Sequence, residues 1–366
     1  MLKRLHLHNF TVFADADFEF GPGLNVIVGA NGTGKSHVLK AGYALQYYLS
    51  EQFREQYDVI NGHTMSSGRI YTFSLETKLT ALFQPYPYQV NELIRRPHLV
   101  PTAAVKATFS YTDGEVITDL MIMPEPDGML YSSDKAPSTF NLSLRVIPPV
   151  FVPAKEVLTL GWLAPMYALR TVPIDQTYPD LLRLLGALPL NAPDPKIFET
   201  LDRLLRTIGG KVEEEGGRFY LSTPDQPRME MNMVAEGMRK FATLYKLLAN
   251  GTLTPETTLF WDEPEANLNP ALLKEMAAIL AELARAGFQI ILATHSLFLM
   301  KELHILSQKQ PLPIKYFGLY ADEKVGTQVE TQDDFMQLQH IAALDAELAQ
   351  TFDFEDALDQ DYAGDS

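Results

Sequence analysis

The chain has 366 residues, 46% of them hydrophobic, and a formal net charge of −16 from 30 basic and 46 acidic side chains. This composition supports a sizeable core in one large domain or two lobes, and the negative charge disfavours unaided binding of nucleic acid. The absence of cysteine excludes disulfides, Cys-ligated zinc and a thiol nucleophile. We expect a cytoplasmic protein, because no window holds the roughly 18 apolar residues of a membrane span and no signal peptide is visible.

The first elements lead to a glycine-rich loop. Apolar and polar residues alternate through Leu2–Phe20, which predicts half-buried strands before a turn at Gly21-Pro22-Gly23. The apolar run Leu24–Val28 predicts a further strand, and helical spacing follows from Val38 to Leu49. Between them, Gly29–Ser36 reads G-x-x-x-x-G-K-S. Glycines let backbone N–H groups point at a phosphate, and the helix adds the positive end of its dipole, so this pattern is typical of a phosphate-binding loop.

Two polar residues of the loop have an expected role with ATP and Mg²⁺. Lys35 would reach the β- and γ-phosphates, and Ser36 would offer its hydroxyl to Mg²⁺. The residues assigned to nucleotide binding in the loop are Asn31, Gly32, Thr33, Gly34, Lys35 and Ser36.

The middle of the chain changes character several times. Residues 50–100 contain glycine and proline breakers, which predict short helices and loops. Residues 103–151 alternate as strands do and predict an antiparallel sheet, whereas helical spacing returns over 165–209 and short strands follow over 212–233. No heptad pattern is sustained, so we expect no long coiled-coil arm.

A second set of candidate catalytic residues follows strand-like runs near the carboxyl terminus. Leu259–Glu263 is an apolar strand that ends in Asp262 and Glu263. Asp262 would hold Mg²⁺ beside Ser36, and Glu263 would orient and deprotonate the attacking water. His295 ends the next buried strand, where a contact to the γ-phosphate is the functional interpretation and a hydrogen-bonded structural histidine the alternative.

Together these motifs resemble the ATP-binding-cassette (ABC) ATPases of the SMC and RecF class. The similarity extends to the compact AAA-type ATPases related to the heads of OLD-type phage-defence proteins. Gly29–Ser36 matches Walker A, Leu259–Glu263 matches Walker B, Glu265–Pro270 resembles the D-loop and His295 matches the switch histidine. Val234–Lys240 resembles the signature motif. The resemblance implies an α/β fold with a mixed nucleotide-binding sheet, an antiparallel β subdomain and an α-helical signature lobe.

The same resemblance implies a site shared by two subunits, because the signature motif of the family contacts ATP held by the opposite head. Gly237 is the residue assigned to that contact in trans. The chain departs from the family pattern where the signature serine aligns with Ala235 and the first glycine with Glu236. It departs again at Pro149–Glu156, the best match to the Q-loop, which has no glutamine; Lys155 or Glu156 would substitute there.

We therefore expect one two-lobed ATPase domain over residues 1–366. Its nucleotide-binding core would comprise 1–50 and 230–340, with an inserted β and helical region at 51–229 and an acidic tail at 350–366. Within the tail, Asp359-Gln360-Asp361 is interpreted as solvated charge, and the stretch after His295 is short for a Toprim nuclease.

Three functions fit these residues to different degrees. The first is an ATPase whose ATP-dependent homodimer controls a separately encoded partner, such as an effector of an anti-phage defence system. The second is a RecF-like DNA-repair ATPase, for which the small basic clusters are Lys3-Arg4, Arg95-Arg96 and Arg203 with Arg206. The third is a transporter's nucleotide-binding subunit, which the divergent signature disfavours.

Overall fold

The computed structural model describes residues 1–60, 74–86, 89–95, 102–111, 114–124, 130–132, 147–163, 166–167, 172–190, 192–223, 226–322, 325–341, 344, 350–351 and 353–354. The expected acidic tail, with Asp359-Gln360-Asp361, falls almost entirely outside these residues. Within them, no helix has the length and apolar character needed to cross a membrane.

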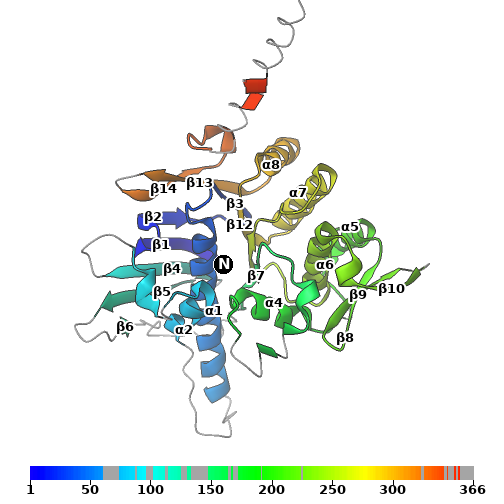
Figure 1. Ribbon diagram of the computed structural model, residues 1–366, viewed down its shortest axis with the longest axis horizontal. Coiled ribbons are helices and arrows are strands. Elements are labelled where there is room, and N and C mark those ends of the chain that lie inside the picture. The colour runs from blue at the N-terminus through cyan, green and yellow to red at the C-terminus, as the bar shows by residue number, and fades with distance from the viewer. Residues whose placement is uncertain are drawn as a thin grey trace, which may run out of the picture.

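A six-stranded sheet forms the middle of the molecule (Figure 1). Its strands are Leu24–Gly29 (β3), Val150–Val152 (β7), Thr258–Asp262 (β11), Gln289–Thr294 (β12), Ile314–Asp322 (β13) and Gly326–Gln332 (β14). They lie in the order β14-β13-β3-β12-β11-β7, and all but the edge strand β14 run parallel. Residues that follow β3, β11 and β12 therefore meet at one edge of the sheet, which is where ligands bind in open α/β sheets.

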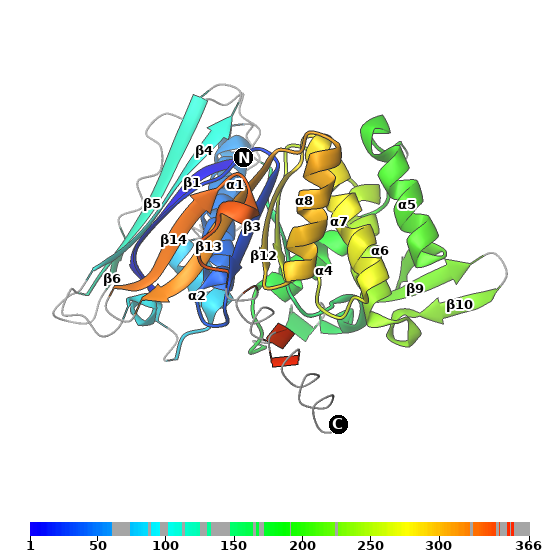
Figure 2. The ribbon, with the colours of Figure 1, turned by 90° about the horizontal axis from the view of Figure 1, so that it is seen from above.

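Both faces of this sheet are buried, which explains why its parallel strands are almost continuously apolar. Val26 and Trp261 belong to one hydrophobic core, and Ile27 and Phe260 to the other. The helices that cover these faces are Lys35–Ile60 (α1) on the second core and Glu236–Ala249 (α6), Pro270–Arg285 (α7) and Leu297–Lys309 (α8) on the first. Figure 2 shows α1 on one side of β3 and β12, and α6–α8 on the other.

An antiparallel sheet packs beyond α1. Its strands are Leu2–Phe10 (β1), Phe13–Glu19 (β2), Ala103–Tyr111 (β4), Gly114–Pro124 (β5) and Leu130–Ser132 (β6), in the order β2-β1-β4-β5-β6. Leu5 pairs with Phe18 on one side and with Ala107 on the other. Strands from the expected insertion 51–229 thus complete this sheet with β4 and β5, and the central sheet with β7.

The helical lobe contains Thr177–Leu185 (α4), Phe198–Ile208 (α5) and a small sheet of Lys211–Glu215 (β8), Arg218–Thr223 (β9) and Gln226–Glu230 (β10). In Figure 2, α5, β9 and β10 lie at the end of the molecule opposite the antiparallel sheet, whereas α4 lies nearer the middle. The predicted fold class is confirmed: a mixed nucleotide-binding sheet, an antiparallel β subdomain and a helical lobe that carries α6. One prediction is wrong in its bounds, because α1 continues past Leu49 to Ile60. No glycine or proline occurs between Leu49 and Asn61-Gly62, so the helix has no reason to end at Leu49.

A buried ion pair joins the two lobes beside α1. Lys78, on the helix Leu75–Phe83 (α2), lies 2.5 Å from Asp180 on α4, and the two side chains are 2% and 6% exposed. The Tyr43 hydroxyl on α1 donates to the same carboxylate at 2.7 Å, and the Lys78 ammonium stands 3.5 Å above the Tyr47 ring. Burial lowers the pKa of Lys78, and Asp180 opposes that shift. Three helices therefore depend on one carboxylate.

Loss of that carboxylate should destabilise the fold strongly. Asp180→Leu leaves Lys78 buried without its counter-ion, so we expect a loss of about 3–5 kcal/mol in the free energy of unfolding, measured by urea denaturation. Adding Lys78→Met should recover most of that loss. Asp202→Leu removes an exposed partner of Arg206 and should cost less than about 1 kcal/mol. An Asp180→Leu variant as stable as wild type would show that the pair contributes nothing.

Candidate active site

The loop between β3 and α1 has the backbone geometry of a phosphate cradle. Gly32 and Gly34 take φ angles of +82° and +93°, in the left-handed region that favours glycine. A Cβ on Gly34 would lie 2.6 Å from Cγ2 of Val12 and 2.7 Å from the Phe13 ring, so a larger residue has no room there. The glycines that the sequence assigned to phosphate binding are thus required by the local backbone.

Lys35 is the first residue of α1 and folds back over the loop. Its ammonium donates to the carbonyls of Gly29 at 2.7 Å and Ala30 at 2.9 Å. Burial lowers the pKa of Lys35, whereas the carboxylates of Glu263, Asp262 and Glu265 raise it. The ammonium therefore stands between the loop and the acidic end of β11. If a phosphate were bound in the loop, the Lys35 ammonium would exchange these carbonyl partners for a charge-assisted hydrogen bond to the phosphate.

Ser36 and Asp262 meet across the same edge of the sheet. Asp262 ends β11, and a side-chain hydrogen bond joins it to Ser36. Burial raises the pKa of Asp262, which the Ser36 bond and two nearby lysines partly offset. A hydroxyl beside a carboxylate gives two of the oxygen ligands that Mg²⁺ takes in nucleotide sites, where phosphates and water supply the others. These two residues thus fit a magnesium ion bound with a nucleotide.

Glu263 faces the phosphate loop from the turn after β11. It has a positive φ of +47°, and its N–H donates to the Ala293 carbonyl at 2.9 Å. It lines a hollow of about 170 Å³ together with the loop residues Asn31, Gly32, Gly34, Lys35, Ser36 and His37. A carboxylate in this place can accept a proton from a water that attacks a bound phosphate.

His295 and Glu265 complete this edge of the sheet. Nδ1 of His295 lies 3.4 Å from Oε1 of Glu263 and 3.6 Å from Oε1 of Glu265. The latter oxygen also accepts from the Thr294 hydroxyl at 2.5 Å and from the His295 N–H at 3.1 Å. Glu265 therefore ties the end of β12 to the turn after β11. Glu265 was expected in the D-loop without this role, although a third carboxylate directly after Asp262-Glu263-Pro264 was a signal for it.

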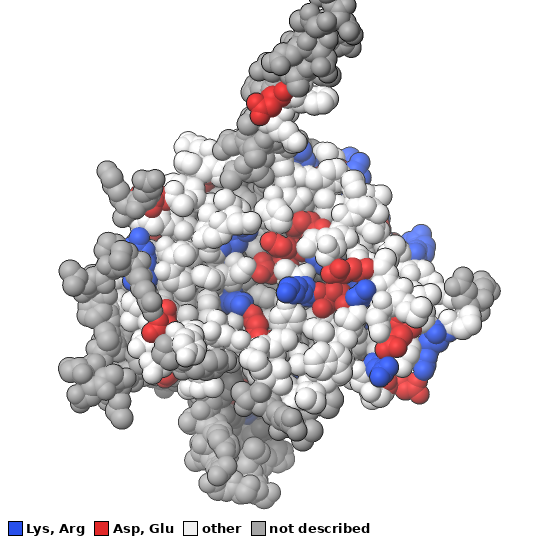
Figure 3. All heavy atoms as spheres, viewed as in Figure 1, with Lys and Arg blue, Asp and Glu red and all other residues white. Residues whose placement is uncertain are grey.

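In Figure 3 acidic and basic side chains gather near the middle of the face shown in Figure 1, in the area where the ribbon has β12, β7 and α6. Much of the surrounding described surface is uncharged.

The signature-like segment contacts its own D-loop. α6 begins at Glu236, whose carboxylate accepts from the Asn267 amide at 2.8 Å. A Cβ on Gly237 would lie 3.0 Å from the Asn267 carbonyl oxygen and from Cδ2 of Leu268, so a glycine permits this close approach. Residues 234–237 are not among the described residues that line the hollow at the phosphate loop. Gly237 therefore does not join the other site residues within one subunit.

The two candidate Q-loop residues, Glu156 and Lys155, differ in their contacts and in their exposure. Glu156 is buried and accepts from the Arg239 guanidinium of α6 at 2.9 Å and from the Thr159 hydroxyl at 3.1 Å. Lys155 is exposed. Glu156 thus joins the chain after β7 to the signature helix. This partner could not be predicted from the sequence, because Glu156 and Arg239 are far apart in the chain.

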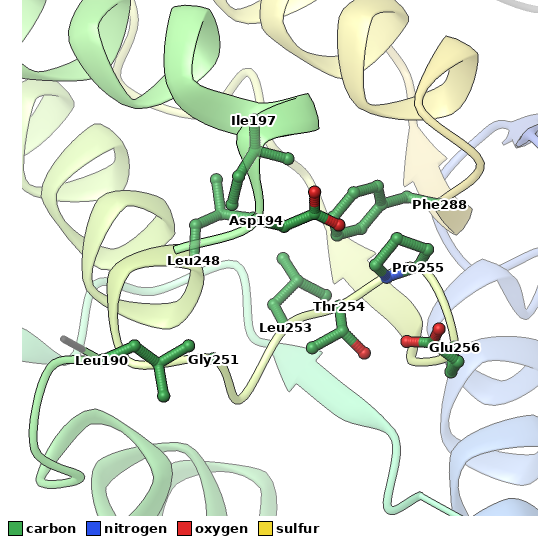
Figure 4. Close-up of a pocket in the computed structure, with 10 residues that line it drawn as sticks. All are labelled: Leu190, Asp194, Ile197, Leu248, Gly251, Leu253, Thr254, Pro255, Glu256 and Phe288. Carbon is green, nitrogen blue, oxygen red and sulfur yellow. The ribbon is translucent and has the colours of Figure 1, made fainter. Parts of the chain in front are cut away.

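A second hollow, of about 140 Å³, lies away from this site (Figure 4). Its lining is largely apolar and includes Leu190, Ile197, Leu253 and Phe288. Leu253 precedes β11 and Phe288 precedes β12, so the hollow lies at the amino ends of the parallel strands. It is therefore at the edge of the sheet opposite the phosphate loop.

Parts of the chain match known families and curated proteins. Residues 4–96 match a family described as "AAA domain", and residues 173–301 match one described as "AAA domain, putative AbiEii toxin, Type IV TA system". The DNA replication and repair protein RecF of Limosilactobacillus reuteri is 36% identical over 67 residues, which are 18% of this chain and 18% of RecF. The DNA double-strand break repair Rad50 ATPase of Archaeoglobus fulgidus is 35% identical over 75 residues, 20% of this chain and 8% of Rad50. The aligned part thus spans less than a fifth of each relative.

Solved structures share the fold over nearly the whole chain. The Smc head domain of Pyrococcus yayanosii, with a coiled coil and joint, has a TM-score of 0.54 at 12% identity and covers 95% of this chain and 99% of its own. The Smc head domain of Pyrococcus furiosus, bound to the C-terminal domain of ScpA, has a TM-score of 0.51 at 14% identity and covers 97% and 99%. Likeness at these identities shows a common fold.

The Lys35 contacts generate a first test of the site. Lys35→Ala should weaken Mg-ATP binding by at least about 100-fold, because a charge-assisted contact to phosphate is worth about 1.5–3 kcal/mol and more than one would be lost. Isothermal titration calorimetry measures the affinity. Lys274→Ala, which removes a 63% exposed lysine paired with Glu302, is the matched control and should bind as wild type does. Unchanged affinity of Lys35→Ala would show that this is not the phosphate site.

Proposed function

We propose that this chain, an ABC-type ATPase of the SMC/RecF class, binds Mg-ATP, closes into a homodimer around it, and reopens when the ATP is hydrolysed. The observation that carries the proposal is the meeting of the phosphate loop with Asp262, Glu263 and His295 at one edge of the central sheet. Binding and the chemistry of hydrolysis would then use residues from three neighbouring strand ends.

Each residue has a distinct step in the proposed reaction. The loop N–H groups and Lys35 would bind the β- and γ-phosphates, and Ser36 and Asp262 would hold Mg²⁺. When bound, the ion would supply positive charge that offsets the charge of the phosphates. Glu263 takes the proton from the attacking water, and His295, next to its carboxylate, contacts the γ-phosphate.

The proposed homodimer is supported by the ATP site of one subunit, which lacks a contact from the signature-like segment. The hollow at the loop is open, and Gly237 touches its own D-loop instead of lining that hollow. A second copy would present the start of α6 to the γ-phosphate through backbone N–H groups, which does not require the signature hydroxyl that Ala235 lacks. Met233, just before α6, is 77% exposed, and Trp162 is 60% exposed. Exposed apolar side chains next to the signature support a surface that is covered in the closed state.

We further propose that residues 1–366 act as one two-lobed unit, with 1–50 and 230–340 as the nucleotide-binding core and 51–229 as the region that docks a partner. Glu156 with Arg239, and Lys78 with Asp180, connect the two lobes within one chain. A change in the relative position of the lobes on ATP binding would therefore also move the surface of residues 51–229.

The partner is proposed to be a separately encoded protein, such as an effector of an anti-phage defence system. The P. furiosus Smc head is bound to another protein, and the family matched over residues 173–301 carries a toxin–antitoxin description, which makes a protein partner reasonable. The second candidate is a RecF/SMC-like DNA-binding ATPase, favoured by the aligned RecF and Rad50 segments.

Charge pairing favours the first candidate over the second. Arg4 makes a bidentate contact with Asp17, in which Nε donates to Oδ1 at 2.8 Å and Nη2 donates to Oδ2 at 2.5 Å. Arg203 lies 3.6 Å from Glu275 and 3.2 Å from Glu282. Basic side chains that are already neutralised by carboxylates contribute little to phosphate contacts on DNA. The remaining cluster, Arg95-Arg96, lies partly outside the described residues.

ATP should trap a dimer when hydrolysis is blocked. Glu263→Gln keeps the shape of the side chain but removes the base, so with Mg-ATP the variant should run at twice the mass of the nucleotide-free protein in light scattering. Lys35→Ala combined with Glu263→Gln is the control and should stay monomeric, because it cannot hold the nucleotide. A Glu263→Gln protein that stays monomeric with saturating Mg-ATP would contradict the shared site.

The choice between partners can be made with one tagged protein. We expect purification from the native host to yield a co-eluting second chain whose recovery depends on ATP, and fluorescence anisotropy to give no submicromolar binding of duplex DNA at physiological salt. Tight DNA binding that falls linearly with the logarithm of salt concentration, by a protein that purifies alone, would favour the RecF-like function instead.

A further inference from the structure

A lysine lies on the buried face of the signature helix. Lys240 is 3% exposed and is spaced four and seven residues before Leu244 and Leu247, on the apolar stripe of α6. A charged side chain at such a position needs a polar partner, because burial of an unpaired ammonium is costly. Its ammonium donates to the backbone carbonyl of Glu263 at 2.7 Å.

This bond holds a peptide whose conformation is unfavourable. Glu263 has a φ of +47°, a region that costs a non-glycine residue about 1–3 kcal/mol and persists only where the surroundings enforce it. Its N–H is bound by the Ala293 carbonyl of β12 at 2.9 Å, and its own carbonyl is bound by Lys240. The turn is therefore held from both sides, by a strand and by α6.

Lys240 stays mostly protonated in spite of its burial. Burial lowers the pKa of Lys240 to about 8, whereas the carboxylates of Glu265, Glu236, Glu263 and Asp262 raise it. A pKa of about 8 leaves the ammonium mostly protonated at pH 7. It thus keeps all three donors while one of them is used by the Glu263 carbonyl.

We propose that Lys240 is a positioning residue that fixes the main chain of Glu263, so that the side chain of the base faces the phosphate loop, and couples it to the signature helix. The inference rests on the proposed ATP hydrolysis and deepens it. Lys240 lies one turn from Gly237, at the end of α6 proposed to meet ATP of the second copy. If that ATP displaces α6, the bond from Lys240 also displaces the turn that carries Glu263 in the same chain.

This coupling links the two ATP sites of a dimer to each other. The start of α6 in one subunit senses the nucleotide of the other, and Lys240 transmits its position to Glu263 of its own subunit. Hydrolysis in each site then depends on occupancy of both. The Arg239–Glu156 pair on the adjacent residue of α6 has a different target, because it reaches the chain after β7.

A test compares two buried lysines of the same helix. Lys240→Met fills the same space without a donor, and Lys246→Met is the matched control, since Lys246 is also buried but lies 5.4 Å above the Phe219 ring, away from the turn. Steady-state ATP hydrolysis should show kcat reduced about 10- to 100-fold in Lys240→Met, with KM within about threefold, because a slightly misplaced base costs this much. Lys246→Met should keep the wild-type kcat.

A double-mutant cycle separates positioning from general packing. In the Glu263→Gln background, radiolabelled phosphate release should fall no further when Lys240→Met is added, since both changes act through one group. A further loss equal to that in the wild-type background would overturn the inference. If Lys240→Met is too unstable to assay, Lys240→Arg keeps a charged donor and should retain more than half the wild-type kcat; a loss above tenfold with an unchanged melting temperature would also overturn it.

Failure of the two proposals can be told apart. A wild-type protein without Mg-ATP hydrolysis overturns the proposed function and the inference with it. Wild-type hydrolysis that Glu263→Gln reduces strongly, together with an unchanged kcat in Lys240→Met, overturns the inference alone. Equal losses in Lys240→Met and Lys246→Met would assign both lysines to packing and overturn it as well.

Discussion

The parallel pairing of β3, β12 and β11 is the constraint on which the rest of the site depends. Val28 pairs with Thr294, and Ala293 pairs with Asp262, so the three strands end at nearly the same level. The phosphate loop, the carboxylates and His295 are each the next residues along their own strand. A shift in register by one residue would reverse which side chains face each core and would separate these groups.

The acidic end of β11 is stabilised by bonds to main-chain atoms more than by bonds between charges. Glu263 is fixed through its N–H and its carbonyl, which leaves its carboxylate available at the hollow. Glu265 uses one oxygen for Thr294 and for the His295 N–H, and its second oxygen is buried without a partner among the described residues. Such a network resists motion of the turn, while the Glu263 carboxylate, 3.4 Å from Nδ1 of His295, lines the hollow.

Three charged side chains connect the helical lobe to the rest of the molecule, and one of them reaches this turn. Arg239 binds Glu156 after β7, Lys240 binds the Glu263 carbonyl, and Asp180 binds Lys78 near α1. Buried polar contacts have strict geometry, because leaving one unsatisfied costs more than the bond contributes. They therefore fix the orientation of the lobe more tightly than apolar packing would.

The sequence by itself determined the elements whose information is local. A strand, a glycine-rich turn and a helix start are encoded in consecutive residues, so Gly29–Ser36 and Leu259–Glu263 could be recognised, and the α/β class with them. Tertiary structure alone decided which distant segments share a sheet: β4 pairs with β1, and β7 pairs with β11. It also decided the partners of Glu156, Asp180 and Lys240. The acceptor of Lys240 is a main-chain carbonyl, and any residue has one. Only the fold selects which carbonyl lies within reach.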